Sequence, residues 1–203
     1  MESLLCSRRP SLVMTSLHTQ EQELVISVVR KLGRFTITDM VCDHTTHLIC
    51  GEARRTLNIL YGLARGCWFV SKEWVLQSLE VGYWLDESPY EVLDMFPSAK
   101  VRRELKAKGG NSFKPDIFSS LGHMFISPKV APPRDHLCSL VKLCHGQVTQ
   151  SLNRAEVYIG AEFHPDKMSV SPAWVLDCIT EQKLLSMDNY KLGRPKRESS
   201  PEF

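Results

Sequence analysis

Residues 70–76 read VSKEWVL, and residues 170–176 read VSPAWVL. Five of the seven positions are identical, and they include a tryptophan, of which the chain has only 4. A match of this quality between two segments 100 positions apart is not expected by chance and is typical of an internal repeat. The two heptads therefore predict a chain built from two copies of one small unit.

Within each heptad, a short apolar stretch is followed by residues that favour the start of a helix. Ser71 and Ser171 are expected to cap a helix by accepting a backbone N–H bond. Pro172 is expected at the first helical position, where its missing N–H has no cost. The tryptophan, the leucine and the residue three positions further on (Leu79 or Ile179) share one helical face, which suits packing against a sheet.

The segments around the heptads recur in the same order. In the first copy, the expected strands cover residues 11–16 and 47–50, and the expected helices cover 20–32 and 56–65. In the second copy, the expected strands cover residues 123–127 and 156–159, and the expected helix covers 135–144. The second copy has no full counterpart of the helix 56–65, and a shorter stretch, residues 161–167, replaces it. Strands that alternate with helices predict an α/β fold, in which helices cover the faces of a parallel sheet.

The composition is that of an ordinary globular protein. At 203 residues the chain has room for two domains of about 100 residues each. Its net charge of +2 is too small for a general nucleic-acid binder, and no apolar run is long enough to cross a bilayer. The 7 cysteines are scattered as single residues, which favours reduced thiols over a disulfide framework.

The repeat also divides the chain into regions. We expect a first repeat over residues 10–98, a linker over 99–120 and a second repeat over 121–192. The linker is predicted from its Gly-Gly pair and its concentration of charge, and the apolar residues in its second half predict that it packs on the repeats. Residues 193–203, rich in proline, serine and charge, are predicted to be disordered.

Four short strings resemble one protein family. The sequence TTHLI at 45–49, RTLxxxxG at 55–62 and GCW at 66–68 precede VSxxWVxxS at 70–78. Together they are similar to the BRCT domain family, and because both copies have the helix tryptophan, the resemblance covers roughly residues 10–192. It implies two tandem BRCT repeats, each a four-stranded parallel sheet flanked by about three helices.

The resemblance to tandem BRCT pairs implies phosphopeptide binding without catalysis. In such pairs a pocket of the first repeat holds a phosphoserine, and a groove between the repeats holds the residue at +3, usually an aromatic one. The sequences of residues 55–68 and 140–148 resemble one member of the BRCT family more specifically. The ligand implied for that member is the phosphorylated C-terminal tail of a damage-marked histone variant. That tail ends in an aromatic residue with a free carboxylate.

The same resemblance implies the setting of the protein. We expect a nuclear, chromatin-associated monomer, with the centrosome as a second location, that acts in the DNA damage response and in the control of chromosome condensation. The expected partner is a phosphorylated protein tail. No small-molecule substrate, cofactor, metal, membrane or nucleic acid is expected as a ligand.

The resemblance places the phosphate pocket on three residues. Thr15 would supply a hydroxyl, and Ser16 a backbone N–H and its own hydroxyl; without the resemblance, this pair would be interpreted as a plain turn after a strand. The third family position holds a lysine, but here it is Asn58, which brings no charge. Phosphate affinity could therefore be weaker, Arg54 could stand in as an auxiliary cation, or more of the affinity could come from the other end of the peptide. We favour the last two in combination.

The resemblance places recognition of the +3 residue and of the terminal carboxylate on three further residues. Arg55 would bond the peptide main chain and fork onto the carboxylate, which a lysine could not copy. Its alternative interpretation is an exposed arginine at a helix start. Leu60 and Pro132 would form the apolar walls of the groove for the aromatic side chain.

The residues also bear on three other functions: zinc binding, catalysis, and binding of DNA or of unmodified proteins. Cys42, His44, His47 and Cys50 have the donor types of a zinc site, but in a strand residues 44 and 50 face away from 47, and no CxxC motif is present. No catalytic motif of a hydrolase, kinase or nucleotide-binding enzyme is present. DNA-end binding through the basic run at 100–108, or docking of unmodified proteins on the repeats, stays as an alternative, although no aromatic residues interleave with that run.

Overall fold

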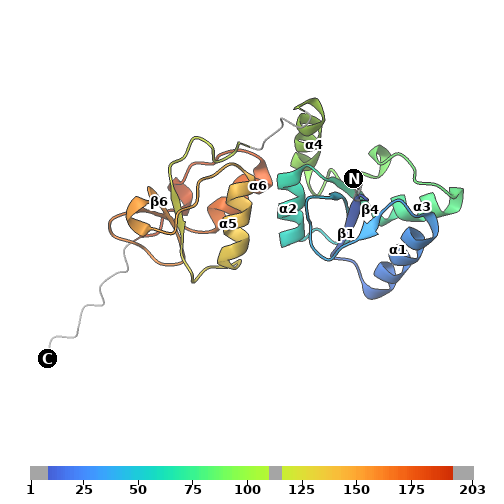
Figure 1. The fold of residues 1–203 in the computed structure, drawn as a ribbon, viewed down its shortest axis with the longest axis horizontal. Coiled ribbons are helices and arrows are strands. Elements are labelled where there is room, and N and C mark those ends of the chain that lie inside the picture. The colour runs from blue at the N-terminus through green and yellow to red at the C-terminus, as the bar shows by residue number, and fades with distance from the viewer. Residues whose placement is uncertain (1–8, 110–115, 194–203) are drawn as a thin grey trace, which may run out of the picture. The chain divides into compact units, whose positions relative to one another are not determined.

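The computed structural model describes residues 9–109 and 116–193 (Figure 1). Backbone contacts divide the chain into two units, residues 1–113 and 114–203. We call their described parts the first repeat and the second repeat. Each contains one parallel sheet with helices packed on it, as the alternation of strands and helices predicted.

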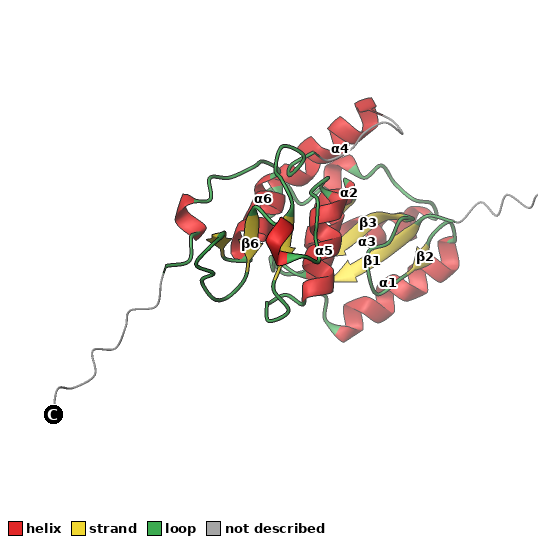
Figure 2. Cartoon of the chain, turned by 60° about the vertical axis from the view of Figure 1, so that its left-hand side comes forward, coloured by secondary structure: helices red, strands yellow, loops and turns green. Residues whose placement is uncertain are grey.

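The first repeat contains a four-stranded parallel sheet in the order β2-β1-β3-β4. Figure 2 shows β1, β2 and β3 side by side. The strands are β1 (Ser11–Thr15), β2 (Thr36–Ile37), β3 (Thr45–Cys50) and β4 (Trp68–Ser71). The helices are α1 (Thr19–Leu32), α2 (Leu57–Arg65), α3 (Lys72–Val81) and α4 (Pro97–Gly109), and residues Ser88–Tyr90 form a short 3-10 helix, η1.

Helices cover both faces of this sheet. Leu12, Ile49 and Val70 belong to a buried cluster with side chains of α1 and α3. Because successive side chains of a strand point to opposite faces, their neighbours Leu48 and Phe69 face α2 instead. Helix α2 approaches that face so closely at Gly62 that an added Cβ would lie within 2.9 Å of side-chain atoms of Leu48 and Phe69. A side chain at position 62 would push the helix off the sheet.

The second repeat is a smaller version of the same arrangement. It contains β5 (Met124–Ile126), β6 (Val157–Ile159) and β7 (Met168–Val170), all parallel. A single parallel bridge between Met124 and Val148 takes the place of the fourth strand that the family pattern predicts. The described residues of this repeat include the helices α5 (Arg134–Leu143) and α6 (Ala173–Glu181) and the 3-10 helices η3 (Leu152–Arg154) and η4 (Asp188–Tyr190). Residues 161–167 are not helical, so α2 has no counterpart here.

The two heptads form equivalent strand-to-helix turns. Trp74 and Trp174 are both 0% exposed, and their indole N–H groups donate to the carbonyl oxygens of Leu85 and Leu185, at 2.9 and 3.0 Å. These acceptors are again 100 positions apart. The tryptophans are thus the centre of each core, as their position on the predicted helical face indicated.

Details of the predicted helix starts need correction. Ser171 accepts the backbone N–H of Ala173 at 3.3 Å, but the side chain of Ser71 forms no capping bond. Pro172 occupies the position before the helix and not the first helical position. The two heptads predicted the strand-to-helix turns correctly. The capping bonds depend on side-chain rotamers that the sequence does not specify.

The first part of the predicted linker is also different. Residues 97–109 form α4, which packs against α2 and β4 within the first repeat. Ala99 and Arg102 are buried on its inner face, whereas Lys100, Glu104, Lys106 and Lys108 are exposed on the outer face of this amphipathic helix. Phe113 and the predicted tail from residue 194 onward lie outside the described residues. Among the helices that are described, none is long and apolar enough to span a membrane.

Candidate phosphate-binding site

Two threonine hydroxyls meet where β1 ends and α2 begins. The Oγ1 atoms of Thr15 and Thr56 are 2.9 Å apart. The alternation of side chains along β1 turns Thr15 toward the face covered by α2, and Thr56 caps that helix by accepting the backbone N–H of Ile59 at 3.3 Å. Hydroxyl groups and the positive end of a helix dipole are thus at the same place, which favours an anion.

The turn after β1 is fixed by a close backbone approach. Ser16 has a left-handed backbone, with φ of 55°, and its carbonyl oxygen accepts the N–H of Glu52 at 3.1 Å. A Cβ on Gly51 would lie only 1.9 Å from that carbonyl oxygen. Only glycine therefore allows the loop after β3 to pass so close to Ser16, and the loop holds this turn in place.

Two arginines precede the cap of α2. Arg54 and Arg55 are exposed, in the segment that connects β3 to α2. Arg54 forms an ion pair of 2.6 Å with the exposed carboxylate of Glu52. A surface pair of this kind has little net stability, so a ligand anion could compete with Glu52 for Arg54. Arg55 directly precedes the capping Thr56, beside the hydroxyl pair in sequence.

Asn58 makes contacts that the family pattern does not predict. Its Nδ2 donates to the carbonyl oxygen of Asp39 at 2.9 Å, and its Oδ1 accepts the N–H of Val41 at 3.1 Å. Both ends of the side-chain amide thus bind the backbone of the loop before β3. The arrangement gives Asn58 a role in fixing this loop to α2, and its contact with a phosphate stays a prediction. A lysine could not make both bonds, because it has no acceptor.

The two residues predicted to line the groove belong to different repeats. Leu60 lies on α2 and is 2% exposed, while Pro132 lies in the second repeat, just before Pro133 and the start of α5. The groove for a +3 side chain stays a prediction.

An ion pair that the sequence did not predict lies close to Ser16. A cavity of about 340 Å³ lies at the carboxyl ends of β1, β3 and β4, lined in part by Ser16 and Gly51. Within it Lys72 binds the carboxylate of Glu21. This hydrogen bond lowers the pKa of Glu21 and raises that of Lys72. The two residues are 51 positions apart and only the parallel order of the strands brings them together, so no local pattern could predict the pair.

The residues considered for a zinc site make other contacts in the structure. His47 binds Glu87, with 3.0 Å between Nε2 and Oε1, whereas Cys42 lies beside the hydroxyls of Ser11 and Thr45. Within the described part of the chain, no three His, Cys, Asp or Glu side chains are grouped to hold a metal ion. Burial raises the pKa of Cys50 and of Cys67 to about 12, so both thiols stay protonated at neutral pH.

Comparisons with known proteins agree with the fold. Residues 116–191 match the family model of the BRCT domain. Two solved structures have the same arrangement over most of the chain. The S. pombe Brc1 BRCT5-BRCT6 domains align with a TM-score of 0.62 and 19% identity, covering 92% of this chain and 98% of that one. The complex of Rtt107p with a phosphorylated histone aligns with a TM-score of 0.61 and 14% identity, covering 90% and 92%.

The fold of the chain is thus that of a tandem of two BRCT repeats, and residues 116–191 match the BRCT family itself. The sequence of the chain is similar to microcephalin. The protein from Mus musculus is 42% identical over 185 residues, which are 90% of this chain and 22% of the relative. The protein from Homo sapiens is 42% identical over 187 residues, 91% of this chain and 22% of the relative. The chain thus spans about a fifth of the length of these relatives.

Proposed function

We propose that this chain binds a phosphorylated peptide. The phosphoserine binds at Thr15, Ser16 and the start of α2, and the peptide continues toward Arg55, Leu60 and Pro132, which receive an aromatic +3 residue and its free carboxylate. The observation that supports the proposal best is the 2.9 Å contact between the hydroxyls of Thr15 and Thr56 at the start of α2.

The chemistry of this place suits a phosphate dianion. The first residues of a helix have backbone N–H groups without acceptors inside the helix, and the helix dipole adds a partial positive charge. One threonine hydroxyl donates to the other, and the second can rotate its own hydrogen toward a ligand oxygen. Asn58 brings no charge and binds the loop before β3, so we assign the cation that balances the phosphate to Arg54 or Arg55.

The ligand that we propose is the phosphorylated C-terminal tail of the damage-marked histone variant. Similarity to microcephalin and the structural likeness to Rtt107p, whose complex contains a phosphorylated histone, support this choice. On this basis the protein acts in the nucleus on chromatin, in the DNA damage response and in chromosome condensation. The centrosome is a second location to test by imaging.

The test is a binding series with three forms of one peptide, measured by fluorescence anisotropy. The first has phosphoserine, a tyrosine at +3 and a free carboxylate; the second lacks the phosphate, and the third has an amidated C-terminus. We expect tight binding of the first form only, with amidation weakening it. Equal binding of the dephosphorylated form would overturn the proposal in favour of a phospho-independent scaffold. A steep loss of duplex DNA affinity with rising salt, without peptide binding, would favour DNA-end binding.

A pair of matched variants separates the pocket from the rest of the fold. Thr15→Val removes one hydroxyl while keeping the shape of the side chain, and we expect it to lower phosphopeptide affinity about tenfold. Thr149→Val makes the same change in the second repeat, at a position for which no contact with the peptide is proposed, and should leave the affinity unchanged. Equal affinities of the two variants would move the phosphate away from Thr15.

A further inference from the structure

A second cavity lies at the opposite end of the first sheet from Thr15. It has a volume of about 610 Å³, in the range of ligand-binding pockets. Its walls come from the amino ends of β1, β3 and β4 at Pro10, Thr46 and Trp68, from α4, and from the turn between α1 and β2. We propose that this cavity binds an acidic peptide segment, with aspartate or glutamate side chains and without phosphoserine. The site is independent of the proposed phosphopeptide function.

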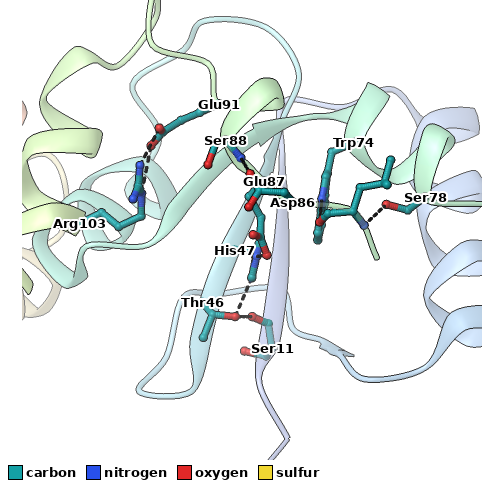
Figure 3. A network of polar contacts seen from close by, with 11 residues as sticks. Ser11, Thr46, His47, Trp74, Ser78, Asp86, Glu87, Ser88, Glu91 and Arg103 are labelled. Atoms are coloured by element: carbon teal, nitrogen blue, oxygen red, sulfur yellow. Dashed lines mark hydrogen bonds and ion pairs between the residues drawn. The ribbon is translucent and has the colours of Figure 1, made fainter. Parts of the chain in front are cut away.

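The floor of the cavity is rigid. His47 is 4% exposed, and its two ring nitrogens lie 3.0 Å from Glu87 Oε1 and 2.7 Å from Thr46 Oγ1. Figure 3 shows His47 between these two partners. The ring also stacks on Trp74, with the planes within 5° of each other. A ligand therefore meets a preformed surface and loses little ordering entropy there.

One cation of the rim is held in place. Arg103 forks onto the carboxylate of Glu91 with bonds of 3.2 and 2.7 Å (Figure 3). Its guanidinium also lies 3.4 Å from the ring centre of Trp68. The carboxylate of Glu91 compensates this charge. Arg103 therefore contributes mainly to the shape of the cavity wall, and its guanidinium has further N–H donors that Glu91 does not use.

Two other cations at the rim of the cavity, Lys106 and Arg34, form no ion pair within the described residues. Lys106 donates to the carbonyl oxygen of Arg65 at 2.7 Å, an uncharged acceptor. Arg34 lies above the ring of Phe35, 5.2 Å from its centre, and within residues 9–109 and 116–193 no ion pair includes it. A negatively charged ligand therefore meets two cations that form no ion pair within the described residues, against one carboxylate, that of Glu87, which binds His47 and is also attracted by Arg34.

The turn that presents Arg34 has an uncommon backbone. Gly33 and Arg34 both have left-handed backbones, with φ of 67° and 72°, and this conformation is costly for a residue other than glycine. The carbonyl oxygen of Gly33 accepts the indole N–H of Trp84 at 3.1 Å and the N–H of Phe35 at 3.0 Å. Tertiary bonds thus hold Arg34 at the edge of the cavity.

The aromatic residues favour a peptide over a single-stranded nucleic acid. Bases bind such sites by stacking on exposed aromatic faces. Here the guanidinium of Arg103 lies over Trp68, and Phe35 is only 5% exposed. What the cavity offers is an apolar lining, to which Pro10 and Ala107 also contribute, with cations at its rim. Aliphatic stems that end in carboxylates match this arrangement.

The test uses a fluorescein-labelled peptide of sequence Glu-Asp-Leu-Glu-Asp-Leu, acetylated and amidated, and a control in which Gln and Asn replace Glu and Asp. We expect the acidic peptide alone to bind, with a shift of the Trp68 indole resonance in ¹H–¹⁵N spectra. The double variant Arg34→Glu with Lys106→Glu should lose at least about tenfold in affinity. Lys100→Glu with Lys108→Glu makes the same change of net charge outside the cavity and should keep it within about twofold.

Three outcomes would overturn the inference: no binding of the acidic peptide, equal losses in both double variants, or a single-stranded oligonucleotide that displaces the peptide. Both double variants change exposed side chains, and thermal melting shows whether they fold. The phosphopeptide affinity of the Arg34 and Lys106 variant should stay unchanged, so that failure of this site and failure of the proposed function give different results.

Discussion

The two repeats share a buried helix tryptophan but differ in the strand residues of the sheet on which that helix packs. Strand pairing places His47 opposite Trp68 in the first repeat and Val157 opposite Met168 in the second. Glu87, the partner of His47, likewise corresponds to Met187, 100 positions later. The first repeat thus has a buried polar pair where the second has apolar residues. The two copies thus share the packing of the helix on the sheet, while the buried polar pair is present in the first copy only.

The second difference concerns helix α2. In the first repeat it brings the N-terminal dipole, the capping Thr56 and two arginines to the end of β1, whereas residues 161–167 of the second repeat form no helix. Among the described residues, the anion site that we propose at the start of α2 therefore has no equivalent in the second repeat. The phosphate site that we propose therefore lies where the copies diverge.

The strongest way to test the shared core is to remove its tryptophans. Trp74→Ala and Trp174→Ala should each cost about 3–5 kcal/mol of unfolding free energy and unfold the affected repeat, because both side chains are fully buried. Urea unfolding followed by circular dichroism measures the loss. Tyr83→Ala, at an exposed aromatic residue of the first repeat, should change stability by less than about 0.5 kcal/mol. A tolerated change at either tryptophan would contradict the equivalence of the two cores.

Arg55→Ala tests the divergent part of the first repeat. We expect a loss of about 2 kcal/mol in affinity for the phosphopeptide with a free carboxylate, since a charge-assisted fork is removed. The melting temperature should not change, because the side chain is exposed. The amidated peptide should lose less affinity than the free acid. If both peptides lose equally, Arg55 does not bind the carboxylate.

Asn58 distinguishes a structural role from a ligand contact. Asn58→Ala leaves the N–H of Val41 and the carbonyl of Asp39 without their partner, and we expect the first repeat to lose about 1–2 kcal/mol of stability. Phosphopeptide affinity, measured below the melting temperature, should stay within about twofold. A large gain in affinity from Asn58→Lys would instead place residue 58 at the phosphate, as the family pattern implies.

Acid should affect the first repeat more than the second through Glu87. The hydrogen bond from His47 holds the pKa of Glu87 below its ordinary value of 4.5. A carboxyl with a lowered pKa in the folded state stabilises the fold above its ordinary pKa, and this contribution disappears as pH falls through the folded-state value. The effect should be less than about 1 kcal/mol, because Glu87 is partly exposed to solvent. Glu87→Gln should remove it in pH-dependent unfolding of the first repeat, and an unchanged pH profile would contradict this role.

Local sequence patterns predicted the tandem architecture. The heptads, the order of strands and helices and the missing counterpart of α2 all depend on periodicity and on turn residues, which act over a few positions. The strand β2 and the helix α4 were missed. β2 has only two residues, and the charge of α4 suggested a linker, although one face of that helix is buried against α2 and β4.

Apart from β2 and α4, the sequence by itself determined where the strands, the helices and the two cores lie, because burial follows from the spacing of apolar residues. The tertiary structure alone decided which polar groups meet. Thr15 and Thr56 are 41 positions apart, Glu21 and Lys72 are 51 apart, and His47 and Glu87 are 40 apart. Each pair forms because parallel strands return to the same edge of the sheet after a helical crossover. Polar contacts are directional and work only over short distances, so a one-dimensional pattern does not specify them.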